Sequence, residues 1–116
     1  MYNCLMYKEW LKGSLRTIIL KLLSERPRMY GYEISRIVDK RSENNIRITE
    51  GALYPALHKL ESQGYLLSEK IQMGKRVRKY YWLTPKGQTE ALENIEEYFN
   101  HVRTMLLLLS NKKPAR

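Results

Sequence analysis

The sequence predicts a mainly α-helical fold with one small β-hairpin, in the order helix, helix, short strand, helix, hairpin and long final helix. Three observations predict this fold. Apolar residues recur at helical spacing in several segments, two stretches rich in strand formers flank a glycine-containing turn, and capping residues, proline or glycine mark the segment ends. A chain of 116 residues has room for one compact domain and one extra helix.

The first long helix is predicted to begin at Ser14, a good N-cap residue. It is predicted to end before Pro27, because the residue before a proline is pushed out of the helical region. Its buried face is formed by Leu15, Ile18, Ile19, Leu22 and Leu23. A short leading helix is predicted ahead of it from the apolar residues Tyr2, Leu5, Met6 and Trp10.

A second helix is predicted to follow Gly31 and to stop between Arg41 and Asn45, where the chain becomes polar and prone to turns. Its apolar face is formed by Tyr30, Ile34, Ile37 and Val38. Residues 46–48 alternate between apolar and charged side chains, which predicts a short strand.

The third helix is predicted to start at the cap residue Thr49 and to close at Gly64, the residue type most used to end a helix. Its inward-facing residues are Leu53, Ala56, Leu57 and Leu60. The opposite face carries Gly51, Pro55, His58 and Ser62, flanked by Tyr54 and Lys59. A proline inside a helix removes one backbone hydrogen bond, so this helix is predicted to start late or to bend early.

A β-hairpin is predicted from the strand formers of residues 65–72 and 77–83, with the turn at 73–76. Thr84 followed by Pro85 is a strong start signal for the last helix, which is predicted to run to about Ser110. The broad apolar arc of this helix comprises Ala91, Leu92, Ile95, Tyr98, Phe99, Val102, Met105, Leu106 and Leu109. Such an arc is too wide for one partner, which predicts contact with its own domain and with a second subunit.

Net charge narrows the class of partner. The chain has 21 Lys and Arg against 12 Asp and Glu, a formal charge of +9, which favours nucleic acid or an anionic membrane surface. Glu93, Glu96 and Glu97 lie across the last helix from its apolar arc and suit an anionic bilayer poorly. No apolar run is long enough to span a bilayer. Together with these acidic residues, this predicts no membrane partner.

Other function classes are excluded by the residues that the sequence lacks. The single cysteine, Cys4, cannot form an internal disulfide, and no signal peptide is read at the start, so a reducing cytoplasm is expected. No nucleophile with a base, paired carboxylates, metal cluster or phosphate loop is found, and His58 and His101 lie far apart. The sequence predicts neither an enzyme nor a metal site nor a bound cofactor.

The predicted order of elements is that of a winged helix-turn-helix followed by an association helix. A helix about 10–12 Å across fits the major groove of B-DNA, and a hairpin can reach the neighbouring backbone or minor groove. The third helix is then the reader, and its candidate DNA contacts are Thr49, Glu50, Tyr54, His58 and Lys59. Each of three residues also has a simpler interpretation. Glu50 stabilises the helix by placing a negative charge at the positive end of its dipole, Tyr54 packs beside the core, and His58 is an ordinary surface residue.

The hairpin carries the densest positive charge, because Lys75, Arg76, Arg78 and Lys79 place four cations within five residues. A polyphosphate offsets their mutual repulsion through counterion release. Charges on a hairpin also serve solubility and edge protection, which is the alternative interpretation. The sequence thus predicts a regulator that binds double-stranded DNA, with a winged-helix module that binds protein or RNA as the alternative.

Five segments resemble the PadR family of transcriptional regulators: GSL at 13–15, YGYEI at 30–34, EGALYPAL at 50–57, LESQG at 60–64 and RKYYWLTPKG at 78–87. The resemblance implies a winged-helix domain, a homodimer clasped by the C-terminal helix, and repression of a gene linked to stress, detoxification or multidrug efflux. Residues 1–83 are then the DNA-binding domain with its N-terminal helix, 84–110 the dimerisation helix, and 111–116 a basic flexible tail.

The resemblance also implies roles for particular residues. The family's DNA-facing positions fall around Thr49, Tyr54 and His58 and on the basic hairpin. The dimer interface falls on the last helix, at Leu92, Ile95, Tyr98, Phe99, Val102 and Leu106. Some members bind a flat aromatic effector against a tryptophan of this helix. The matching position here is Tyr98, with Trp10 able to reach the same cavity; the alternative is that Tyr98 is an interface aromatic.

Overall fold

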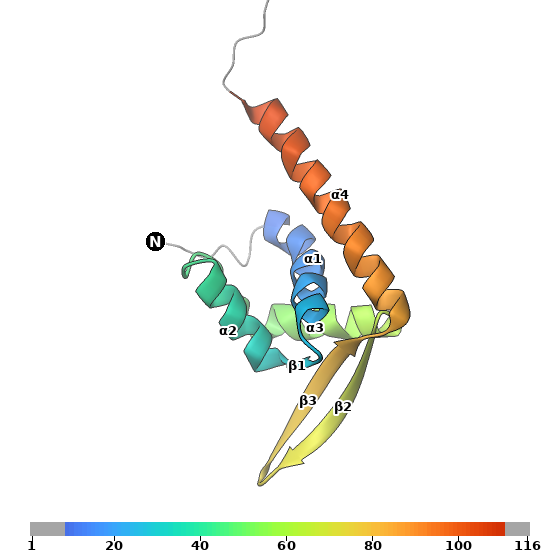
Figure 1. The fold of residues 1–116 in the computed structure, drawn as a ribbon. Coiled ribbons are helices and arrows are strands. Elements are labelled where there is room, and N and C mark those ends of the chain that lie inside the picture. Colours follow the sequence, from blue (N-terminus) through green and yellow to red (C-terminus); the bar gives the residue numbers. More distant parts are fainter. Residues whose placement is uncertain (1–8, 111–116) are drawn as a thin grey trace, which may run out of the picture.

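The computed structural model of the chain describes residues 9–110, apart from the side chains of residues 9, 10 and 12. Over this range the fold has four helices and a three-stranded sheet (Figure 1). In chain order the elements are α1 (Glu9–Glu25), β1 (Met29–Tyr30), α2 (Gly31–Arg41), α3 (Glu50–Ser62), β2 (Leu66–Met73), β3 (Arg76–Leu83) and α4 (Pro85–Leu109). This is the mainly helical fold with a small β wing and a C-terminal helix that the sequence predicts.

The core lies where the first three helices meet the base of the sheet. Its fully buried side chains come from every one of these elements: Ile19, Leu20, Met29, Ile34, Leu53, Leu57, Leu60, Leu66 and Tyr81. Each buried aliphatic side chain of this size contributes about 1.5–3 kcal/mol relative to leaving it in water. This shared core holds α3 against α1, α2 and β2, with its other face open to solvent.

The sheet has the strand order β1-β3-β2 and is antiparallel throughout. Side chains alternate between its faces, so Met29 and Tyr81, which pair across the sheet, both point into the core. Their neighbours Tyr30 and Tyr80 form the next pair and lie on the opposite face. The β2–β3 hairpin extends past the core to a turn at Gly74, whose φ of +62° suits glycine.

Several predicted boundaries are confirmed. The Thr49 hydroxyl accepts a hydrogen bond from the Ala52 amide at 3.2 Å and caps α3, and Gly64 follows that helix with a φ of +86°. The Thr84 hydroxyl caps α4 by accepting from the Gly87 amide at 2.9 Å. Each boundary is set by residues adjacent in sequence, which is why local pattern predicts it.

Three predictions about the first half of the chain are wrong. Residues 46–48 form no strand, although Ile48 is buried. The strand that completes the sheet beside the hairpin is β1, which pairs with β3. Ser14 is no N-cap, because α1 begins at Glu9 and Ser14 lies inside it. Pro55 does not delay α3, which already begins at Glu50, so the predicted late start is wrong, while the alternative of an early bend stays a prediction. The predicted leading helix lies outside the described residues, except that Trp10 belongs to α1.

Helix α4 packs only in part on the rest of the chain. Its first half lies along α1, where Ala91 is buried, and its second half projects away from the body (Figure 1). From Phe99 onward its side chains are exposed, including four consecutive leucines at 106–109. No helix in the described part of the chain is long and apolar enough to cross a membrane.

Candidate nucleic-acid interface

Helix α3 presents one face to solvent. Buried Leu53, Leu57 and Leu60 fix the helix on the core, and the opposite side leaves exposed Glu50, Gly51, Pro55, His58, Lys59 and Ser62. Three of the predicted reader residues, Glu50, His58 and Lys59, are therefore accessible to a partner. The Thr49 hydroxyl caps the helix by accepting from the Ala52 amide, which leaves its O–H able to donate to a partner such as a phosphate.

Tyr54 lies on the flank of α3 and packs against the start of α2. A Cβ placed on Gly31 would overlap the Tyr54 ring, so the close approach of the two helices requires glycine at this position. Burial raises the pKa of the Tyr54 phenol, and the nearby Glu50 carboxylate adds to the shift. The phenol is therefore protonated at neutral pH and can donate a hydrogen bond, although much of its ring serves packing.

The four cations of the hairpin do not form a single cluster. Lys75 and Arg76 are exposed at the turn, whereas Arg78 and Lys79 lie half-buried on β3. Because successive residues of a strand alternate, Arg78 and Lys79 point to opposite faces. The Arg78 guanidinium lies 4.4 Å from the centre of the Tyr30 ring, and the Lys79 ammonium lies 5.5 Å from that of Tyr81.

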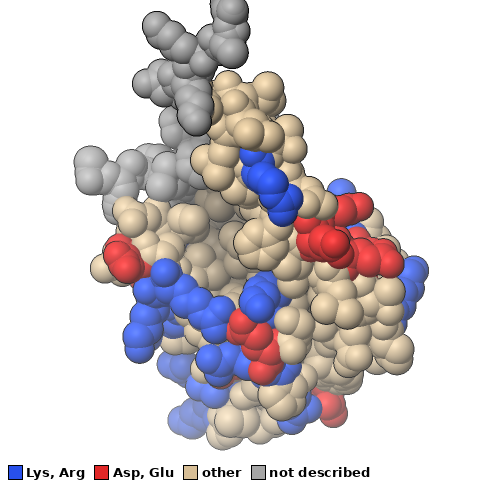
Figure 2. All heavy atoms as spheres, turned by 45° about the horizontal axis from the view of Figure 1, so that its top comes forward, with Lys and Arg blue, Asp and Glu red and all other residues tan. Residues whose placement is uncertain are grey.

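Sequence reasoning missed cations that the fold brings beside the wing. Arg28 lies 5.1 Å from the Tyr80 ring centre and 3.6 Å from the Glu69 carboxylate, and Arg36 lies on the first turns of α2. Without the β1–β3 pairing, nothing in the local pattern connects residues 28–36 with residues 78–80. Figure 2 shows many Lys and Arg over the lower left of the molecule, with a few acidic residues among them, and a larger group of Asp and Glu at the right.

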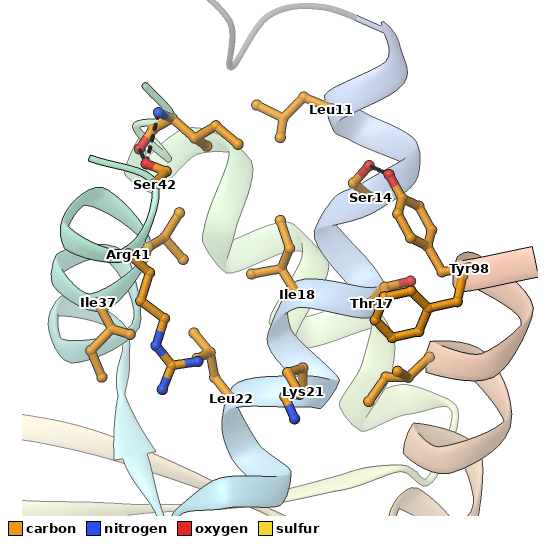
Figure 3. Close-up of a pocket in the computed structure, with 14 residues that line it drawn as sticks. Leu11, Ser14, Thr17, Ile18, Lys21, Leu22, Ile37, Arg41, Ser42 and Tyr98 are labelled. Carbon is orange, nitrogen blue, oxygen red and sulfur yellow. Dashed lines mark hydrogen bonds between the residues drawn. The ribbon is translucent and has the colours of Figure 1, made fainter. Parts of the chain in front are cut away.

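A groove of about 520 Å³ lies between α1, α2 and α4 (Figure 3). Its walls are mostly apolar and include Leu11, Ile18, Leu22, Ile37, Ile95 and Phe99. Tyr98 reaches into it from α4, and Arg41 borders it while paired with Glu25 at 2.6 Å. In the described part of the chain, no group of His, Cys, Asp and Glu could hold a metal ion.

The predicted interface residues of α4 fall into two sets. Leu92, Phe99 and Leu106 are 74%, 65% and 66% exposed, and Val102 is exposed beside them. Ile95 and Tyr98 are instead half-buried against α1 of the same chain. Three polar pairs hold this contact: Arg16 with Glu90 at 2.9 Å, Thr17 with Asn94 at 2.6 Å, and Ser14 with Tyr98 at 2.5 Å. Trp10, the other predicted effector residue, has a side chain outside the described part.

Residues 19–93 match the model of the transcriptional regulator PadR-like family. The chain is a PadR-like transcriptional regulator. This PadR-like chain superposes on a transcriptional regulator from Clostridium thermocellum with a TM-score of 0.81 at 32% identity, covering 89% of this chain and all of that one.

Two further relatives agree with the PadR-like assignment. A PadR family transcriptional regulator from Eggerthella lenta matches with a TM-score of 0.75 at 31% identity, covering 89% of this chain and 88% of that one. A transcriptional regulator of Mycobacterium tuberculosis is 40% identical over 53 residues, which are 46% of this chain and 50% of that protein. The winged fold of the PadR-like chain is thus shared with proteins that regulate transcription.

Proposed function

We propose that this PadR-like regulator is a cytoplasmic homodimer that represses a gene by binding a palindromic operator, and that a small aromatic effector releases it. In this proposal residues 1–83 bind DNA and residues 84–110 associate the two subunits; the tail at 111–116 lies outside the described residues. The family supplies the role in transcription. The chain's own surfaces support the dimer, the operator and the effector.

The single observation that carries the proposal is the unpartnered apolar surface of α4. Leu106, Leu107, Leu108 and Leu109 are each at least 66% exposed at the end of a helix that projects from the body. Burying apolar area stabilises by about 25 cal/mol per Å², so a second copy that covers these leucines gains substantially. A twofold pairing lets each α4 cover the groove of the other subunit, because such an interface uses the same patch twice.

The proposed DNA contacts use the two exposed parts of the winged domain. Helix α3 enters the major groove with His58 and Lys59 toward base edges or phosphates, and Glu50 accepts from a cytosine amino group or supports the helix N-terminus. The wing places Lys75, Arg76, Arg78 and Lys79 against the neighbouring backbone. Phosphate contacts of this kind position the protein, and the base contacts of α3 select the site.

The experiment combines sedimentation with selection of bound duplexes. We expect a dimer in solution, and enriched duplexes with two related half-sites about one helical turn apart, near 34–36 Å. Affinity is expected to fall steeply as salt rises. A monomer that ignores double-stranded DNA in dilute buffer, or one that prefers single-stranded RNA, would contradict the proposal.

The effector part of the proposal rests on the groove beside Tyr98. A cavity of about 520 Å³ is within the usual size of small-molecule pockets, and its aromatic members Tyr98 and Phe99 offer ring faces for stacking. A screen of flat aromatic compounds for release of the selected duplex tests it. Tyr98→Ala should abolish release, whereas Tyr98→Phe, which keeps the ring and loses only the hydroxyl bonded to Ser14, should still be released; a compound that releases Tyr98→Ala equally acts elsewhere.

A further inference from the structure

The wing and the start of α2 are joined by a continuous row of side chains, which we name the Arg–Tyr row: Arg36, Tyr32, Tyr30 and Arg78. The Arg36 guanidinium lies 5.6 Å from the Tyr32 ring centre and donates to the Tyr32 hydroxyl at 3.0 Å. The rings of Tyr32 and Tyr30 stack with their centres 6.5 Å apart. Arg78 then covers the Tyr30 ring at 4.4 Å.

Tyr30 is itself held in place by two neighbours. Its ring meets the edge of the Tyr80 ring at 5.3 Å, and its backbone amide donates to the Glu33 carboxylate at 3.1 Å. The strand register sets Tyr30 opposite Tyr80 on the face of the sheet that points away from the core. Tyr30 therefore lies where a strand pairing meets the start of α2.

Both arginines of the row keep most of their hydrogen-bonding capacity. In the part of the chain that the structure describes, neither Arg36 nor Arg78 forms an ion pair with a carboxylate. A guanidinium has five N–H donors, and the hydrogen bond from Arg36 to the Tyr32 hydroxyl uses one of them. Arg28 differs, because Glu69 partly neutralises it.

We propose that the Arg–Tyr row extends the DNA-backbone contact of this regulator from the wing to α2, and that Tyr32 positions the Arg36 guanidinium, and Tyr30 the Arg78 guanidinium, on phosphates. The row borders the reading helix, since the Tyr54 ring of α3 packs against Gly31 between its two tyrosines. A planar guanidinium stacked on a ring loses less freedom when it binds a phosphate, and the positive end of the α2 dipole lies beside it. This inference rests on the proposed function.

The test measures affinity of the full chain for a random-sequence duplex over a range of salt, because phosphate contacts do not depend on sequence. Arg36→Ala and Arg78→Ala should each weaken binding about tenfold. Removing one phosphate interaction should reduce the slope of log K against log salt by about 0.9, or about 1.8 in a symmetric dimer. Arg26→Ala is the matched control, because it also removes one exposed arginine but lies outside the Arg–Tyr row, beside the depression between the end of α1 and the start of α4. Its affinity and salt slope should stay close to those of the wild type.

The positioning role needs a second readout. Tyr30→Leu should weaken duplex binding when Arg78 is present but should cause no further loss of affinity in the Arg78→Ala variant. If Tyr30 were merely structural, Tyr30→Leu would weaken binding equally in both. Tyr30→Phe keeps the ring and should bind like the wild type. If the wild type binds duplex but Arg36→Ala keeps its affinity and salt slope, the inference is wrong and the proposed function stands; if the wild type binds no duplex, both are wrong.

Discussion

The hydroxyls of Ser14 and Tyr98 lie 2.5 Å apart and join the middle of α1 to the middle of α4, although 84 positions separate them in the chain. Either hydroxyl can donate. With the Thr17–Asn94 and Arg16–Glu90 contacts, this pair sets how α4 leaves the winged domain. In the proposed dimer that direction also sets the spacing between the two reading helices.

Removing this hydrogen bond should lower stability without changing the fold. Ser14→Ala and Tyr98→Phe are each expected to reduce the free energy of unfolding in urea by about 0.5–1.5 kcal/mol. The double variant should lose less than the sum, because both changes remove the same bond. Ser62→Ala changes an exposed serine that donates to the carbonyl of Lys59 in its own helix, and it should stay within about 0.5 kcal/mol of the wild type. Fully additive losses would show that the two hydroxyls do not interact.

Tyr81 should make the protein sensitive to alkaline pH. Its hydroxyl is buried and has no hydrogen-bond partner among the described residues, and burial raises its pKa, helped by Glu61 and Tyr54. Above about pH 10 the unfolded chain loses this proton more readily than the folded one, so the free energy of unfolding falls as pH rises through the folded pKa.

Tyr81→Phe tests this linkage by urea unfolding at a series of alkaline pH values. The variant should be as stable as the wild type at neutral pH, since the hydroxyl it lacks is unsatisfied. Its loss of stability above about pH 10 should be smaller, though still present because burial also raises the pKa of Tyr54. The exposed Tyr32→Phe leaves Tyr81 in place and should show the wild-type loss. An unchanged alkaline profile in Tyr81→Phe would assign the effect to other groups.

A charge on the open face of α4 should separate the proposed subunits. Phe99 is 65% exposed in the single chain, so Phe99→Asp should leave that chain folded. The new carboxylate should prevent the dimer from forming, because it would be buried in the proposed interface. Sedimentation should show a monomer, with circular dichroism unchanged. Thr89→Asp adds the same charge near the start of α4 and should remain dimeric. A dimeric Phe99→Asp protein would place the interface elsewhere.

The tip of the wing should contribute affinity without selectivity. Lys75 and Arg76 are exposed beside the turn, so Lys75→Ala with Arg76→Ala should weaken selected and random duplexes by a similar factor and flatten the salt dependence. His58→Ala on α3 should instead reduce discrimination between the two duplexes, because we propose that His58 contacts a base edge. Titrations on both duplexes measure the two effects; loss confined to the selected duplex would make the tip a base reader.

What the sequence alone determined is local. Thr49 and the pair Thr84–Pro85 mark helix starts because a cap acts on amides two or three positions away, and the apolar spacing of α3 identifies which face is free. The same locality explains the failures: Ser14 is a plausible cap until the helix before it is known, and residues 46–48 alternate like a strand but find no edge to pair with.

Tertiary structure alone decided which distant residues meet. The pairing of Tyr30 with Tyr80 makes β1 a strand, brings Arg36 and Arg78 to one surface and leaves Lys79 on the other face. The contact of Ser14 with Tyr98 likewise turns a predicted interface residue partly toward its own chain. Such contacts depend on how the elements pack around a common core. The free energy of that packing depends on two segments at once, so it cannot be predicted from either segment alone.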